Sequence, residues 1–221
     1  MRIKELTLHT NNLTAVKDFY GSVISMGINS ESSNQVSFQA GATQLIFKES
    51  HTDELPFYHF AFNIPSNKIE DAKKWMEGKA ELLPVSDNNY IADFVNWNAK
   101  SIYFYDSAGN IVEFIARFDL KNDTIEKFDS SQILSISEMG IVTNDVSALT
   151  QKLKEEYKVL DFVKSINSET FSAIGDDNGL FILASENRNW YPTQVPSQKS
   201  SFEIKFINDT GEAFTITDKI V

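Results

Sequence analysis

Hydrophobic and polar residues alternate strictly at the start of the chain. Within residues 3–9 the apolar side is formed by Leu6 and Leu8, and the other side carries Glu5, Thr7 and His9. A period of two residues is typical of a β-strand that buries one face. The sequence therefore predicts a first strand whose polar side chains face away from the core.

A helical pattern follows this strand. Asn12 can cap the helix, and apolar residues recur at three- and four-residue spacings from Leu13 to Val23. Short strand-like segments come next at residues 35–39 and 43–48, separated by a Gly-Ala turn. We interpret this first segment as a β-α-β-β-β module.

The same order recurs in the next part of the chain. A strand is expected at residues 58–64, a helix at 66–76, and strands at 101–105 and 111–116. The polar stretch 119–132 reads as a linker.

A third copy matches the first residue by residue at an offset of 133. Glu5 aligns with Glu138, and residues 10–13 align with residues 143–146. This copy predicts a helix at 145–157 and strands at 170–174 and 180–184. A final strand at 202–207 would open a fourth module that is not completed.

These repeats predict an α+β fold of repeated βαβββ modules, because one such module cannot close its own sheet. We expect two modules in residues 1–118 to form a cupped eight-stranded sheet, residues 119–132 to be a linker, and residues 133–221 to hold the third module and part of a fourth. An unmatched sheet there would favour a homodimer.

Composition narrows the chemistry. The 221 residues include no cysteine, so a metal would have to be held by His, Asp or Glu. The formal net charge of −11 disfavours nucleic acid and anionic lipid as partners. Without a signal-like or membrane-spanning apolar run, we expect a cytoplasmic protein with no membrane partner. The cupped sheet leaves its inner face free to form a cavity, where we expect a small-molecule substrate.

Three stretches resemble the vicinal-oxygen-chelate superfamily, which includes glyoxalase, bleomycin-resistance and extradiol-dioxygenase-like proteins. They are residues 3–9 running into Phe19-Tyr20, residues 58–62, and residues 105–114 with an Asp-x-x-Gly-Asn turn. The resemblance implies metal ligands at Glu5, His59 and Glu113. A fourth family position falls near Ile46, which cannot bind a metal, and the first ligand is more commonly His or Gln than Glu.

The alternation agrees with this set, because Glu5, His59 and Glu113 each alternate with an apolar neighbour. A divalent cation would offset the cost of burying them together. Thr7, His9 and Asn63 share the same inward parity, and we expect them to bind substrate. No residue is assigned a catalytic proton transfer.

Other residues are interpreted structurally. Glu138 repeats the ligand position, but its last-strand counterpart is Ile182 and no second module follows, so we set it aside. The segment 188–192 is expected to cover the third sheet, and His51 to lie in an exposed loop.

Two function classes remain. The first is an enzyme with Mn, Fe, Co, Ni or Zn as a Lewis acid, of lyase, isomerase or dioxygenase type. The second is a metal-free small-molecule binding protein of the bleomycin-resistance type, in which the carboxylates contact a cationic ligand.

Overall fold

The computed structural model describes residues 1–50 and 55–221. Residues 51–54 are outside the described residues, and the prediction for His51 falls among them. Three α-helices are found in the described chain: α1 (Leu13–Asp18), α2 (Ile69–Met76) and α3 (Val146–Tyr157). A π-helical turn at Phe19–Val23 extends α1, and short 3₁₀ turns lie at Val95–Trp97, Phe118–Leu120, Ser130–Gln132 and Asp218–Ile220.

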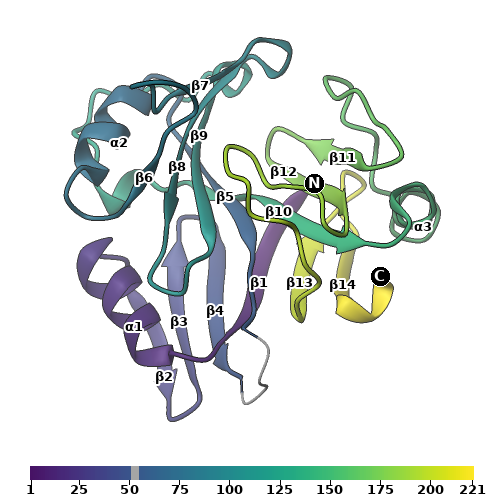
Figure 1. The fold of residues 1–221 in the computed structure, drawn as a ribbon, viewed down its shortest axis with the longest axis horizontal. Helices are drawn as coiled ribbons and strands as arrows, with labels where there is room; N and C mark the ends of the chain where they lie inside the picture. Colours follow the sequence, from purple (N-terminus) through teal and green to yellow (C-terminus); the bar gives the residue numbers. More distant parts are fainter. Residues whose placement is uncertain (51–54) are drawn as a thin grey trace.

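The strands form two mixed sheets. The first, in the order β14-β13-β1-β4-β3-β2, contains β1 (Arg2–Thr10), β2 (Ile28–Ser32), β3 (Gln35–Ala40), β4 (Thr43–Glu49), β13 (Phe202–Ile207) and β14 (Ala213–Thr217). The second, in the order β11-β12-β10-β5-β9-β8-β6 with β7 beside β8, contains β5 (His59–Ile64), β6 (Leu82–Leu83), β7 (Ala92–Phe94), β8 (Ala99–Tyr105), β9 (Ile111–Arg117), β10 (Ser135–Thr143), β11 (Phe171–Asp176) and β12 (Gly179–Ser185). Figure 1 shows the helices on the outside, with α1 and α2 on one side of the molecule and α3 on the other.

The way the modules pair differs from the expectation. The first module does not share a sheet with the second; β1 lies between β4 and β13, so the first module pairs with the incomplete fourth. The second module pairs with the third through antiparallel β5 and β10. The expected unmatched C-terminal sheet is therefore absent from the described residues, and a homodimer stays a prediction.

The linker explains this pairing. Phe128 is buried and packs edge-on against Trp75 of α2 and Phe114 of β9. These contacts hold the linker against the second module. The backbone N–H of Leu134 then donates a hydrogen bond to the carbonyl of Asn63, near the end of β5. The chain thus begins β10 beside β5.

Most of the local predictions are confirmed. The side chain of Asn12 accepts a hydrogen bond from Ala15 N at 2.9 Å, and Asp145 caps α3 in the same way through Ala148 N at 2.8 Å. The predicted strands agree with the observed ones within two residues, whereas β2, β14 and the short strands β6 and β7 were not located. The residues of β2 are all exposed, so no apolar alternation marks that strand.

The main core lies between the sheets and their helices. Leu6, Phe60 and Phe114, the apolar neighbours of the predicted ligands, are fully buried in it. Helix residues such as Val16, Met76 and Leu153 join the same cluster. The opposite face of the second sheet carries a separate, smaller apolar cluster that includes Tyr103, Ile182 and Trp190. None of the helices in the described chain has the length and apolar character to span a bilayer.

Candidate metal centre

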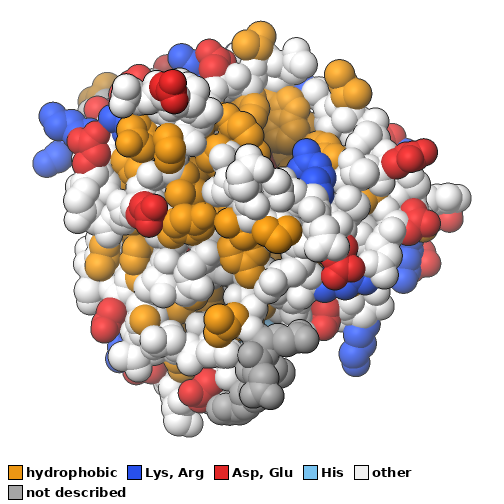
Figure 2. Space-filling model, viewed as in Figure 1, with side chains coloured by type: hydrophobic (Ala, Val, Ile, Leu, Met, Phe, Trp, Pro, Cys, Tyr) orange, Lys and Arg blue, Asp and Glu red, His pale blue; other side chains and the backbone are white. Residues whose placement is uncertain are grey.

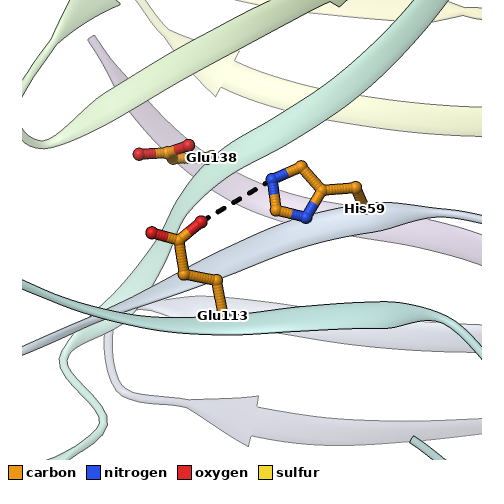
Figure 3. A group of neighbouring side chains, drawn as sticks. All are labelled: His59, Glu113 and Glu138. Atoms are coloured by element: carbon orange, nitrogen blue, oxygen red, sulfur yellow. Dashed lines mark ion pairs between the residues drawn. The ribbon is translucent and has the colours of Figure 1, made fainter. Parts of the chain in front are cut away.

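Three acidic or imidazole side chains converge on the inner face of the second sheet. Ala61 on the central strand β5 pairs with Glu113 on β9 and with Glu138 on β10. His59 lies two residues before Ala61 and therefore faces the same side. Because Ala61 is small, the flanking carboxylates and the imidazole meet above it, and Figure 3 shows the three side chains directed toward one another.

A β-bulge places Glu138 on this face. The register between β10 and β5 shifts between Ile136 and Glu138, which leaves Ser137 as the extra residue. A one-residue shift reverses which face the following side chains occupy. The same shift occurs in β1 between Ile3 and Glu5, so the structure repeats at the offset seen in the sequence.

The geometry of the three side chains suits a cation. One ligand atom from each of His59, Glu113 and Glu138 lies within 4.8 Å of the other two, and no other such group of three occurs in the described part of the chain. His59 Nε2 is 3.6 Å from Glu113 Oε2, which is too long for a hydrogen bond. His59 Nδ1 donates to the Ile111 carbonyl at 3.2 Å, so Nε2 is left with a free lone pair facing the carboxylates.

The Asp106–Asn110 turn fixes the start of β5. Asp106 accepts hydrogen bonds from Asn110 N at 2.9 Å and from the Tyr20 hydroxyl at 2.8 Å. Asn110 Oδ1 in turn accepts from Tyr58 N at 3.0 Å, immediately before His59. The turn that joins β8 to β9 therefore holds the start of β5, where His59 lies, beside Ile111.

Burial determines the protonation of the site. It lowers the pKa of His59 to about 4, so the imidazole is neutral at neutral pH. Burial, reinforced by the negative charge of Glu138, raises the pKa of Glu113 to about 8. A carboxyl held so far above its usual pKa is one that a cation would stabilise in its ionised form.

Arg117 compensates the second carboxylate. Its fully buried guanidinium forms an ion pair with Glu138 and donates to Asn63 Oδ1 at 3.2 Å and to Asp177 Oδ1 at 3.3 Å. Burial raises the pKa of Glu138, and the guanidinium in contact with it opposes that shift. Glu138 is therefore held in one orientation before any ligand arrives.

A cavity of about 260 Å³ opens beside these groups. Its wall combines His59, Glu113, Glu138 and Arg188 with apolar side chains, mostly aromatic: Phe94, Trp97, Tyr103, Phe171, Ile182, Trp190 and Tyr191. Figure 2 shows apolar side chains, some of them deep-set, gathered between the positions that β9 and β12 have in Figure 1. The volume is slightly below the usual range of about 300–1,000 Å³ for ligand pockets, so the cavity suits a small molecule.

The structure does not bring Glu5 to this site. Glu5 lies on β1 in the other sheet, forms an ion pair with Lys205 at 2.8 Å, and leaves 31% of its side chain exposed. The expected convergence of Glu5 with His59 and Glu113 is wrong, because the first module pairs with the fourth rather than the second. Glu138, its counterpart in the third module, occupies the place expected for it.

The three residues expected to bind substrate also lie away from the cavity. Thr7 and His9 are on β1, and the backbone N–H of His9 donates to the Tyr58 hydroxyl at 3.1 Å. Asn63 faces the predicted side of β5, but Arg117 and the Asp177 carbonyl use its amide, and it does not line the cavity. The positions of Thr7, His9 and Asn63 do not support the prediction that they contact the substrate.

Three functional features were set aside or missed. The repeat identified Glu138 as the equivalent of Glu5, but Glu138 was set aside because the third module was not expected to pair with the second. Arg117 gave no signal beyond its place at the end of an apolar strand. The segment 188–192 does cover the third module, as expected, yet it also forms one wall of the cavity.

Comparisons with known proteins agree on the fold. No family model and no curated protein matches the sequence significantly. A solved structure of a Bacillus subtilis protein proposed to be a dioxygenase is 13% identical, with a TM-score of 0.62 over 98% of this chain and 84% of that one. A glyoxalase I mutant from Zea mays is 9% identical, with a TM-score of 0.60 over 99% of this chain and 94% of that one.

Proposed function

We propose that this chain, which has the vicinal-oxygen-chelate fold, is a divalent-metal-dependent enzyme acting on a small oxygen-bearing substrate. The observation that carries the proposal is the convergence of a neutral imidazole and two buried carboxylates beside a cavity. A lyase, isomerase or ring-cleaving dioxygenase is the class of enzyme that fits such a site.

The side chains fit a metal by their donor chemistry. One imidazole nitrogen and two carboxylate oxygens suit Mn, Fe, Co, Ni or Zn. The Ile111 carbonyl accepts the Nδ1 hydrogen of His59 and so fixes the imidazole tautomer, as backbone carbonyls commonly do for metal-bound histidines. Ile182 occupies the remaining family position, so three protein ligands would leave coordination sites free. When bound, the metal would serve as a Lewis acid toward two substrate oxygens.

The protein's own residues prepare the site. Arg117 orients Glu138, and the fixed imidazole presents Nε2 without rearrangement. Glu113 must release its proton to become a metal ligand. The hydroxyl of Tyr103 lies beside the Glu113 carboxyl and, by hydrogen bonding to it, favours the ionised form. The aromatic side chains of the cavity wall would pack against a bound substrate.

Elemental analysis of protein purified without added metal tests this proposal. We expect one divalent ion per chain in the purified protein. If the protein is purified without metal, we expect it to bind one added Mn, Ni or Zn ion per chain, as measured by titration calorimetry. His59→Ala should abolish uptake, whereas the matched His9→Ala should retain it, because His9 lies on the other sheet. A protein that contains no metal and binds none of the three added ions would refute the proposal.

A metal-free binding protein is the second candidate. The Arg117–Glu138 ion pair favours it, because this pair balances one carboxylate without any cation. In that case His59→Ala would leave the affinity for a small ligand nearly unchanged. A large loss of ligand affinity in this variant would exclude the second candidate.

A further inference from the structure

Arg188 is a charged residue in the cavity wall that the proposed metal centre does not use. Its guanidinium carbon lies 4.8 Å from the centre of the Phe171 ring, and Nη1 donates a long 3.4 Å hydrogen bond to the Asn189 carbonyl. Within residues 1–50 and 55–221, no carboxylate comes within ion-pair distance of it. On a chain with a net charge of −11, an arginine in a cavity wall without an acidic partner is a candidate anion contact.

The backbone around Arg188 is fixed. Arg188 N donates to the Ser185 carbonyl at 3.2 Å, and its own carbonyl accepts from Ser197 N at 2.8 Å. Two residues on, the buried Trp190 ring packs 5.1 Å from the His59 ring. The segment that carries Arg188 is thereby anchored beside the metal-ligand cluster.

Aromatic rings line the space between these groups. Tyr191 packs edge-on against Tyr103 at 5.6 Å and against Phe94 at 5.9 Å, which links the 188–192 segment to β7 and β8. Rings on several sides of a small cavity favour a flat ligand that can stack or meet ring edges.

The charges select the sign of the ligand. The proposed function assigns Glu113 and Glu138 to the metal, and Glu138 also forms an ion pair with Arg117. Among the described residues that line the cavity, Arg188 is the one arginine or lysine. A bound divalent cation would add positive charge on the other side of the cavity, which favours an anionic ligand.

We propose that the substrate is a flat aromatic carboxylate, with its carboxylate held by Arg188 and its ring held between the aromatic walls. The proposal rests on the proposed function, in which oxygen atoms of the substrate bind the metal. It adds the charge of the substrate, which is negative, and its shape, which is flat.

Probe binding tests the assignment. Trp97 and Trp190, two of the three tryptophans, line the cavity, so intrinsic fluorescence reports its occupancy. Benzoate, benzamide and benzylammonium are titrated into wild-type protein, Arg188→Gln and the matched Arg2→Gln, in which an exposed arginine on the other sheet is neutralised. Each titration is run with chelator and with added Mn. Cyclohexanecarboxylate supplies the charge without the flat ring.

In wild-type protein and Arg2→Gln we expect benzoate to bind about tenfold more tightly than benzamide, the scale of one charge-assisted contact. Benzylammonium and cyclohexanecarboxylate should bind more weakly than benzoate. Arg188→Gln should lose the preference for benzoate over benzamide.

Equal binding of benzoate and benzamide, a preference that persists in Arg188→Gln, or binding of none of the probes would overturn the assignment. Cyclohexanecarboxylate binding as tightly as benzoate would overturn its aromatic part. An Arg188-dependent preference in a protein that binds no metal would support the anion contact while refuting the metal proposal. A protein that binds metal but shows no such preference would support the metal proposal and refute the anion contact at Arg188.

Discussion

At the scale of single residues, the burial of Glu113 lowers the stability of the metal-free protein. Burial and the negative charge of Glu138 raise the pKa of Glu113 from the 4.5 of an ordinary glutamate to about 8 in the folded protein. Between these pH values the folded state binds more protons than the unfolded state, so the contribution of Glu113 to stability falls as pH rises. Residues placed for ligand binding often oppose stability in this way.

Replacing Glu113 by Gln should therefore stabilise the metal-free protein at pH 8. The gain should be roughly 1–3 kcal/mol in the free energy of unfolding, and it should shrink as the pH is lowered toward 4.5. Denaturant unfolding with chelator present measures it. Glu5→Gln, which removes a half-exposed carboxylate, should give no such gain, and a Glu113→Gln variant less stable than wild type at every pH would contradict the assignment.

Individual residues also show what the sequence could reveal of the site. His59 and Glu113 were predictable, because a polar ligand-type residue in an otherwise apolar strand needs a partner. Arg117 was not, because its partner Glu138 comes from a strand whose position depends on long-range pairing. The role of Arg188 depends on a loop that returns over the sheet, which no periodicity encodes.

At the scale of elements, close packing between β10 and the 188–192 segment shapes the cavity. A Cβ atom on Gly140 would lie 2.7 Å from Trp190 Cη2 and 3.1 Å from the His59 carbonyl. The absence of a side chain there lets the Trp190 ring approach β10 closely beside His59. The bounds of most strands followed from hydrophobic periodicity, whereas this contact between distant elements did not.

Gly140→Ala should displace Trp190. We expect a loss of roughly 1–3 kcal/mol in stability from overpacking, together with a shift in tryptophan emission. Gly27→Ala is the matched control, because a Cβ there meets nothing within 4 Å. Equal stability and equal emission in the two variants would show that Trp190 does not pack as described.

At the scale of the whole molecule, the fold follows from which modules pair. The predicted vicinal-oxygen-chelate resemblance is confirmed as a fold, and the α+β class with repeated modules is observed. The repeat at an offset of 133 established that Glu5 and Glu138 are equivalent, but equivalence does not say which module lies beside which. In the structure the third module lies beside the second, and Phe128 of the linker packs against the second module. Glu138 therefore takes the position in the proposed centre that was expected for Glu5.

The metal content of two matched variants tests this pairing most directly. Glu5→Gln and Glu138→Gln make the same chemical change at equivalent positions of the repeat. After loading with Mn and removal of excess metal, Glu5→Gln should retain the wild-type stoichiometry and Glu138→Gln should lose most of it. Retention of metal by Glu138→Gln together with its loss from Glu5→Gln would contradict the proposed centre.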